Sequence, residues 1–159
     1  MQAQPQGFLI DAGDKRGAVK CDLIAEVARR FGEVRLKVTG TSMLPSLWPG
    51  DILTVRRQGT AEIGEVVMFA RQGRLVAHRV VGKTLRQDRT VLVTRGDRLR
   101  KPDPPVYAEE LLGRVTAIER HRGRRPRRIV PRLTVWAGMA SWVLCRSEFC
   151  TQLLLRLRR

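Results

Sequence analysis

The sequence is poor in the residues that mark several protein classes. Its 159 residues include only 3 cysteines, 14 glycines and 8 prolines. Cys21, Cys145 and Cys150 form neither a disulfide framework nor a Cys-x-x-Cys or Cys/His spacing that would hold zinc. The small share of glycine and proline excludes a collagen-like or low-complexity chain. We therefore expect free thiols, a reducing compartment, and neither a metal nor any other cofactor.

Long apolar runs are also missing. No stretch of about 18 uncharged apolar residues, the length that spans a bilayer as a helix, occurs anywhere in the chain. The first 30 residues are interrupted by charged side chains, among them Asp11, Lys20 and Glu26. We therefore expect neither an N-terminal signal peptide nor a membrane-spanning anchor.

Acidic residues are scarce relative to basic ones. Thirty-one Lys and Arg stand against 15 Asp and Glu, which gives a net charge of +16 with histidine neutral. Residues 120–159 account for +10 of this charge, with eleven Arg and one acid. Such a charge predicts attraction to anionic surfaces such as nucleic acid or acidic lipid headgroups, and it does not choose between them.

The chain does have the length and apolar content of one folded domain with tails, since 43% of its residues are hydrophobic and 29% charged. Apolar residues recur at helical spacing from Val19 to Phe31, and Gly32 then ends the pattern. Short runs rich in β-branched residues follow, separated by turn signals. We predict a mainly β fold, a barrel or sandwich core, with six strands at residues 34–38, 52–55, 65–69, 75–81, 91–94 and 111–118.

These patterns divide the chain into four parts: a loose arm at residues 1–17, a folded domain at 18–119, a solvated Arg-rich linker at 120–132, and an amphipathic C-terminal helix at 133–159. The longest uncharged run of that helix has 13 residues. This corresponds to about 20 Å of helix, less than the ~30 Å hydrocarbon layer. We expect the helix to lie on a membrane or to pack on the domain.

The stretch from Gly40 to Asp51 has the composition of a turn that displays a nucleophile. Ser42 follows a predicted strand, in a turn that Gly40 opens and Pro45 stiffens. A serine presented in this way can also donate its own backbone N–H to an oxyanion. The same stretch fits a hairpin connection in which Ser42 is only a turn former.

One predicted strand carries two ionisable residues, His78 and Arg79. They point to opposite faces because the side-chain period of a strand is two, and Val76 and Val80 share the face of His78. A histidine titrates near neutral pH and can therefore accept a proton without special tuning. Considered alone, His78 also fits a hydrogen-bonded core histidine.

Two aspartates six residues apart, Asp97 and Asp103, flank a basic loop after the fifth predicted strand. Either could orient His78 through the second ring nitrogen of the imidazole. Each also fits a structural role, Asp97 as the cap of a turn and Asp103 as the partner of a nearby Arg or Lys.

Taken together and in this order, these segments resemble the type I signal peptidase family of serine endopeptidases, over about half of the chain. The family pattern Gly-x-Ser-Met-x-Pro-(Ser/Thr)-Leu-x-x-Gly-Asp is matched at Gly40, Ser42, Met43, Pro45, Leu47, Gly50 and Asp51. Residues 64–69 resemble the family's Gly-Asp-(Ile/Val)-Val-x-Phe strand. His78-Arg79-Val80 is similar to the endoplasmic-reticulum and archaeal branch, whose general base is histidine where the usual bacterial branch has lysine.

The resemblance implies a signal-peptidase-like fold and a role for each residue of the motifs. Ser42 would be the nucleophile and its N–H an oxyanion donor, and His78 would be the general base. Met43 and Pro45 are expected to contact the substrate. A Ser–Lys mechanism needs a buried neutral lysine, and Lys83, near the end of the same strand as His78, is a poor candidate.

The spacing of Gly96, Asp97 and Asp103 matches the histidine branch and implies Asp103 as the orienting acid, with Asp97 supporting it. The match is incomplete, because Arg98 and Leu99 stand where the branch has two asparagines. How the two aspartates divide the work is left open.

The resulting hypothesis is a serine endopeptidase of the signal peptidase I type, which cleaves a leader or signal peptide after small residues through an acyl-enzyme. Its partners would be a leader-bearing peptide or protein and an anionic membrane surface bound through residues 120–159. We expect it to be membrane-associated or cytoplasmic, with its orientation open.

Two alternatives remain at this point. One is a partner-specific soluble maturation protease. The other is a nucleic-acid-binding or regulatory module related to the self-cleaving repressors that share this β-fold. The net charge of +16 favours such a module. The repressors, however, use lysine and carry a helix-turn-helix, and only one helix fits before the strands here. Specific recognition of nucleic acid is therefore not expected.

Overall fold

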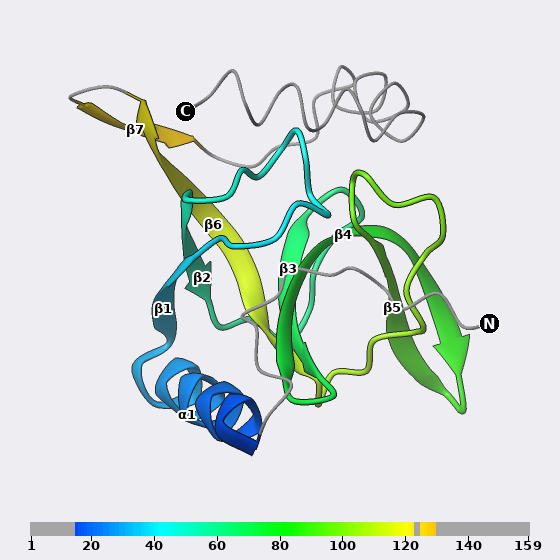
Figure 1. Cartoon of the computed structure of the whole chain (residues 1–159). Coiled ribbons are helices and arrows are strands. Elements are labelled where there is room, and N and C mark those ends of the chain that lie inside the picture. The colour runs from blue at the N-terminus through cyan, green and yellow to red at the C-terminus, as the bar shows by residue number, and fades with distance from the viewer. Residues whose placement is uncertain (1–14, 123–124, 130–159) are drawn as a thin grey trace.

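The computed structural model describes residues 15–122 and 125–129. These residues form one helix, α1 (Lys15–Phe31), and seven strands (Figure 1). The strands are β1 (Glu33–Lys37), β2 (Ile52–Arg56), β3 (Val66–Arg71), β4 (Arg74–Arg86), β5 (Arg89–Arg95), β6 (Leu111–Arg122) and β7 (Arg125–Ile129). Most of the predicted N-terminal arm, the C-terminal helix at 133–159, Cys145 and Cys150 lie outside the described residues.

The mainly β fold and the six predicted strands are confirmed, each within a few residues of the expected start. All strand pairs are antiparallel, in the order β1-β2-β6-β3-β4-β5, and β7 pairs with β6. Within the described sheet the order ends at β1 and β5, so the sheet does not close into a barrel. This corrects the barrel form of the prediction.

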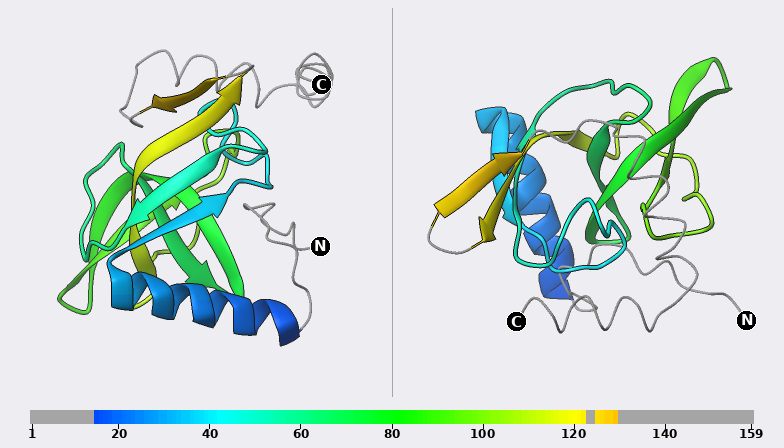
Figure 2. Two further views of the ribbon diagram at one scale, coloured as in Figure 1. Left: turned by 90° about the vertical axis from the view of Figure 1, so that its left-hand side faces the viewer. Right: turned by 90° about the horizontal axis from the view of Figure 1, so that it is seen from above.

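The Arg-rich segment differs from the expected linker. Strand β6 continues to Arg122, and β7 pairs with it as the second strand of a hairpin that projects from the sheet (Figure 2). Two ion pairs lie where β6 enters this segment: Arg120 pairs with Asp51, and Arg35 of β1 pairs with Glu119 of β6 at 2.5 Å. Opposite charges therefore offset part of the repulsion along β6.

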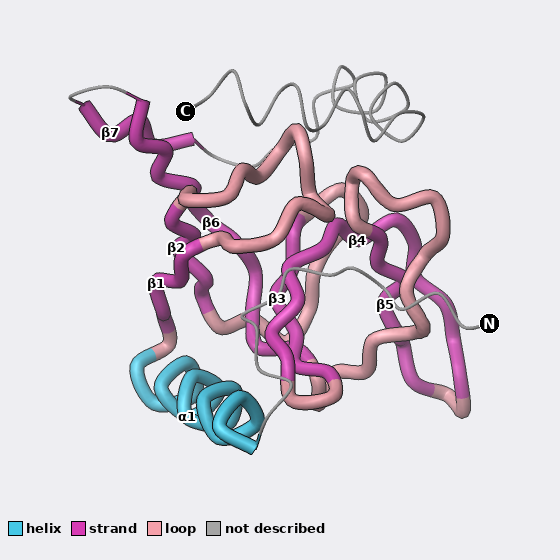
Figure 3. Tube along the Cα trace, in the orientation of Figure 1, coloured by secondary structure: helices cyan, strands magenta, loops and turns pink. Residues whose placement is uncertain are grey.

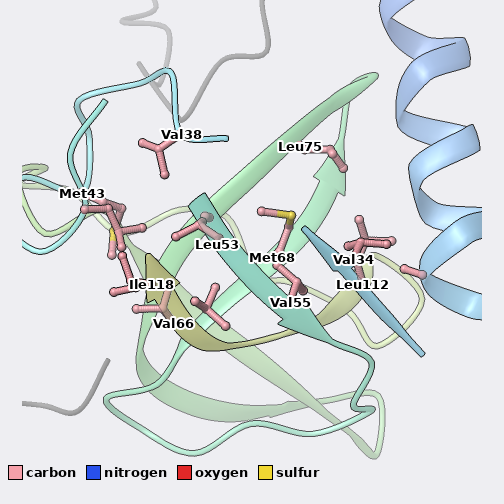
Figure 4. Packing of buried hydrophobic residues seen from close by; sticks show 14 of the residues in the cluster. Val34, Val38, Met43, Leu53, Val55, Val66, Met68, Leu75, Leu112 and Ile118 are labelled. Atoms are coloured by element: carbon pink, nitrogen blue, oxygen red, sulfur yellow. The ribbon is translucent and has the colours of Figure 1, made fainter. Parts of the chain in front are cut away.

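Strand β3 forms the centre of the core because both of its faces are buried. Val66 and Met68 point into one cluster, which also contains Leu53, Leu75 and Ile118. Val67 and Phe69 point into a second cluster, formed with other apolar residues, among them Ala61, Val80, Leu92 and Val106. Figure 4 shows the first cluster extending from Val34 and Leu112 beside α1 to Val38 and Met43 at the other end. The single sheet thus has an apolar cluster on each of its faces.

Helix α1 begins at Lys15, four residues before the first predicted position, and ends at Phe31, directly before Gly32. Gly32 has a φ of +73°, and its N–H donates to Ala28 O at 3.0 Å, a common way to end a helix. The face with Cys21, Ala25 and Ala28 is buried, although the larger residues Val19, Leu23 and Phe31 are exposed. No helix of the described residues is long and apolar enough to cross a membrane.

The first of two long loops lies at the end of the sheet away from α1, and the second starts at that end and runs back to the start of β6, near the α1 end (Figure 1). Residues 38–51 join β1 to β2, and residues 96–110 join β5 to β6 (Figure 3). α1 packs against β1, β4 and β6 at the opposite end. The segments that carry the predicted serine and aspartates thus meet away from the helix.

Candidate active site

The loop at 38–51, which we call the serine loop, is closed at its base by two hydrogen bonds. The Val38 N–H donates to Asp51 O and the Gly50 N–H donates to Val38 O, each at 2.8 Å. Gly50 has a φ of +92°, in the region that favours glycine. These contacts continue the pairing of β1 with β2, so the loop starts and ends on a rigid ladder.

A buried ion pair holds the far side of the serine loop. The Asp51 carboxylate is fully buried and accepts the Trp48 N–H at 2.8 Å. The Arg120 guanidinium donates to both carboxylate oxygens, at 3.0 and 2.6 Å, and to Ser46 O at 3.0 Å. Arg120, expected in a solvated linker, therefore fixes the serine loop.

Ser42, His78 and Asp103 form a continuous chain of hydrogen bonds. His78 Nε2 lies 3.1 Å from Ser42 Oγ, and His78 Nδ1 lies 2.6 Å from Asp103 Oδ2. All three side chains are buried, that of His78 completely and that of Asp103 to 7% exposure. Three segments up to 61 residues apart in sequence thus converge on one site.

The two contacts of His78 fix its tautomer. An ionised carboxylate can only accept hydrogen bonds, so Nδ1 carries the proton and donates to Asp103. Nε2 is then left to accept from the Ser42 hydroxyl. The imidazole can take a proton from the serine in this arrangement, while the carboxylate stabilises the charge that develops on the ring.

The packing of β4 agrees with the face predicted for His78. Its ring lies edge-on to Phe69, with centroids 6.2 Å apart, in the layer that contains Val76 and Val80. The apolar surroundings exclude water from the imidazole and strengthen its contacts with the two polar partners.

Asp103 is held by two other residues. Thr94 Oγ1 donates to Asp103 Oδ2 at 2.7 Å. Arg71 donates to Pro104 O at 2.9 Å and to Pro105 O at 2.7 Å, directly after the aspartate. The loop that carries Asp103 is therefore tied to both β5 and β3.

Glu110 completes the attachment of this loop. Arg71 donates to both oxygens of the Glu110 carboxylate, at 3.0 and 2.8 Å. Burial by itself would raise the pKa of Glu110, but the hydrogen bonds from Arg71 and from the Tyr107 N–H, together with the charge of Arg71, outweigh it and lower the pKa. The carboxylate thus stays ionised and bound to Arg71 at neutral pH.

Gly96 brings the aspartate loop against the serine. A Cβ at this position would lie 2.8 Å from Ser42 O and 3.0 Å from His78 Nε2. The Arg98 N–H donates to the same Ser42 carbonyl at 2.9 Å. Only a residue without a side chain allows this close approach.

Asp97 has a different partner from Asp103. Its carboxylate accepts two hydrogen bonds from Arg79, at 2.8 and 2.6 Å. Arg79 also donates to Gly64 O at 2.8 Å and to Ser46 Oγ at 3.0 Å. The structure places Asp103, and not Asp97, against His78, which distinguishes the positions of the two predicted aspartates.

Other predicted site residues lie as follows. Met43 is 1% exposed in the core, and its sulfur accepts the Asp97 N–H at 3.4 Å, so its side chain does not offer the contact to substrate that was expected. Pro45 is partly exposed. The Ser42 N–H, predicted as an oxyanion donor, has no acceptor among the described residues. Lys83 pairs with Glu62 at 2.9 Å, away from Ser42.

Thr94, Arg71 and Arg120 were not singled out from the sequence. A signal exists for Thr94, because the register pairs it with Val80, which shares the face of His78. Within residues 15–122 and 125–129, no group of three or more His, Cys, Asp and Glu side chains is arranged to hold a metal ion.

Comparison with known proteins identifies the family of this chain. The model of the family described as Peptidase S24-like matches residues 8–109, well over half of the chain. The chain belongs to the peptidase S24-like family. The matched span of this S24-like protein includes Ser42, His78 and both aspartates.

A curated relative points in the same direction. The signal peptidase complex catalytic subunit SEC11 of Scheffersomyces stipitis is 34% identical to the S24-like chain over 76 residues. The match covers 46% of each protein, so it spans about half the length of this relative. This local similarity agrees with the predicted resemblance to type I signal peptidases over about half of the chain.

Proposed function

We propose that this S24-like protein is a serine endopeptidase with Ser42 as the nucleophile, His78 as the general base and Asp103 as the acid that orients His78. The observation that carries the proposal is the chain of two hydrogen bonds, 3.1 Å from Ser42 Oγ to His78 Nε2 and 2.6 Å from His78 Nδ1 to Asp103 Oδ2. A buried structural histidine would need no serine at a glycine-containing turn and no ionised acid on the opposite nitrogen.

The reaction follows from these contacts. Ser42 Oγ attacks the carbonyl carbon of the scissile peptide bond while its proton passes to His78 Nε2. The tetrahedral intermediate then collapses, the C–N bond breaks, and the imidazolium donates the proton to the departing amine. Water attacks the remaining ester of Ser42 with His78 again as the base, which releases the acid and restores the serine.

The Ser42 N–H supports a role in stabilising the oxyanion. It has no acceptor among the described residues and belongs to the residue whose hydroxyl attacks. The negative charge of the tetrahedral intermediate forms close to this N–H, and a fixed donor there lowers the barrier without reorganisation.

The substrate class is a leader or signal peptide cleaved after a small residue. Support comes from the resemblance to signal peptidases and from the similarity to SEC11, the catalytic subunit of a signal peptidase complex. Strand β1 is an edge of the described sheet, and the chain runs from it directly into Ser42. A peptide added along a strand edge would be bound by backbone hydrogen bonds, with small side chains next to the cut.

The test is hydrolysis of a panel of leader-type peptides by the full chain, with mass spectrometry to locate the cut. We expect Ser42→Ala and His78→Ala each to lower kcat/KM by at least about a thousandfold. Ser46→Ala is the matched serine control, because its hydroxyl contacts only Arg79 in the site region, and it should keep most of the activity. Cleavage that persists in Ser42→Ala would contradict the proposal.

We also propose that the basic C-terminal part attracts the protein to an anionic membrane surface. Support comes from the charge of +10 in residues 120–159, since a basic residue near such a surface contributes about 1 kcal/mol. A deletion that begins at residue 130 keeps Arg120, which holds Asp51, and β7, which pairs with β6; it removes +4 of the +10, so we expect a partial loss of binding. Vesicles with and without acidic lipid provide the test, and equal sedimentation of full-length and truncated protein with both would overturn the idea.

A further inference from the structure

Thr94 holds both the side chain and the main chain of Asp103 by hydrogen bonds. Its hydroxyl donates to Asp103 Oδ2 at 2.7 Å, and its carbonyl accepts the Asp103 N–H at 2.8 Å. Thr94 is completely buried near the end of β5. Two bonds from one rigid residue leave the aspartate little freedom to turn.

The oxygen that Thr94 contacts is the one that faces the histidine. Asp103 Oδ2 accepts from His78 Nδ1 at 2.6 Å and from Thr94 Oγ1 at 2.7 Å. A carboxylate with a single partner can rotate about its terminal torsion, which is broad and weakly restrained. A second donor on the same oxygen removes this freedom and keeps the charge of the carboxylate aligned with the ring.

Strand pairing sets the geometry of the three residues. Thr94 is the register partner of Val80, which lies two positions after His78 and therefore on the same face of β4. The β4–β5 ladder thus fixes the distance between the hydroxyl and the imidazole, and Asp103 is held between them. Because the frame is made of paired strands, it exists before any substrate binds.

We propose that Thr94 is a positioning residue, which acts on the reaction through Asp103 by holding His78 in the tautomer with the proton on Nδ1. The inference rests on the proposed function, because that tautomer leaves Nε2 free to accept the Ser42 proton. A threonine with a merely structural role would affect folding stability and leave the tautomer of His78 unchanged.

The kinetic test uses the full chain and a peptide that the wild type cleaves. Thr94→Val keeps the shape and removes the hydroxyl, and we expect it to lower kcat about tenfold with KM unchanged, since a hydrogen bond to a charged group is lost. Thr94→Ser should restore the rate. In an Asp103→Asn background Thr94→Val should have no further effect. Thr54→Val, at a buried threonine of β2, is the matched control.

The second test needs no activity, and it separates failure of this inference from failure of the proposed function. The chain has only two histidines, so ¹⁵N signals of His78 can be assigned with His121→Gln. We expect Nδ1 protonation in the wild type and in Thr94→Ser, and a mixture of tautomers in Thr94→Val. Unchanged His78 signals in Thr94→Val, or an equal loss of kcat in the Asp103→Asn background, would overturn the inference. If Ser42→Ala keeps the activity of the wild type, the proposed function fails. The tautomer of His78 in Thr94→Val then still decides the role of Thr94.

Discussion

Two neighbouring residues of β4, His78 and Arg79, point to opposite faces, and each binds one aspartate of the same loop. Arg79 meets Asp97 through two hydrogen bonds of 2.8 and 2.6 Å, and His78 meets Asp103 through one of 2.6 Å. Both pairs are buried. The lengths and burial are alike, so geometry alone does not separate a structural pair from a reactive one.

The difference lies in the cation and in what else it contacts. A guanidinium keeps its charge throughout the physiological range, so Arg79 is a permanent anchor. An imidazole can accept and release a proton, and His78 Nε2 faces the Ser42 hydroxyl at 3.1 Å. The loop from Gly96 to Asp103 therefore has one end suited to holding the fold and one end suited to moving a proton.

The largest expected difference between Asp103 and Asp97 is in kcat. Asp103→Asn should lower kcat by about 10³ to 10⁴-fold, because an amide can stabilise the wrong tautomer of His78 and no longer balances the imidazolium charge. Asp97→Asn should keep activity within about tenfold per folded molecule, since Asp97 does not contact His78. Single-turnover rates of the two folded variants give the comparison, and equal losses would remove the distinction.

The second largest expected effect is on folding stability, and we expect it at Arg79, on the face of β4 opposite His78. Arg79→Met leaves the Asp97 carboxylate buried without its main partner, which should cost about 3–5 kcal/mol of unfolding free energy. Urea unfolding followed by circular dichroism measures this value. The matched change Arg74→Met, at a partly exposed arginine of the same strand, should cost far less. If the two changes cost the same, Arg79 is not an anchor.

A third pair tests whether Arg79–Asp97 is representative of the structural ion pairs. Arg120→Gln leaves the buried Asp51 with weaker donors, and we expect a loss of about 2–3 kcal/mol, below that for Arg79 because Arg120 is itself 20% exposed. The serine loop should loosen as well, which amide hydrogen exchange of residues 38–51 would report. Arg35→Gln, whose partner Glu119 is 26% exposed, should change stability by less than about 1 kcal/mol.

Gly96 lies against Ser42 and His78 and directly precedes Asp97. A methyl group at Gly96 should disturb the Ser42–His78 contact before the Arg79–Asp97 pair. Gly96→Ala forces a carbon to 2.8 Å from Ser42 O and 3.0 Å from His78 Nε2, and we expect about 1–3 kcal/mol of destabilisation with a fall in kcat. Gly82→Ala, whose nearest contact would be Val93 Cβ at an ordinary 3.8 Å, is the control. Normal activity of Gly96→Ala would show that the loop can move away from the serine.

The smallest expected effect is a dependence of the stability of residues 104–110 on pH. The pKa of Glu110 is lowered in the fold, so its contribution to stability is present above its usual value of 4.5 and is lost as the pH falls through the folded value. Below about pH 4.5, hydrogen exchange should therefore rise in residues 104–110 and less in residues 64–67 beside Arg79. Glu110→Gln should remove this dependence and the exposed Glu109→Gln should keep it. A loop that loosens identically in both variants would point to another titrating group.

The fold was largely predictable because each strand is a short apolar run between turn residues. Leu75 to Val81 shows the strength of this signal, and β4 adds five further residues after it. β7 was missed because it is built from a run of arginines around Pro126, a composition that normally indicates a solvated segment. Its pairing with β6 depends on tertiary contacts that local patterns do not contain.

The site was predictable where a motif names it and unpredictable where distant side chains meet. The resemblance points to Ser42, His78 and Asp103. It does not show which aspartate contacts His78 and which contacts Arg79, because the six-residue spacing of Asp97 and Asp103 is compatible with either pairing. Arg120 lies 69 residues from Asp51, and nothing in a stretch with seven arginines shows which one turns inward. Such contacts come from the assembled sheet alone.

The order of strands has a consequence for how the site can fail. Ser42 follows β1, at one end of the order, while His78 lies on β4, next to the other end. The serine loop extends from β1 across the sheet, and it brings Ser42 Oγ to 3.1 Å from His78 Nε2 although β1 and β4 are not neighbours. A change that shifts the serine loop relative to β4 would separate Ser42 from His78 while every strand stays paired. If the proposed reaction occurs, we therefore expect activity to be lost before the strands unfold.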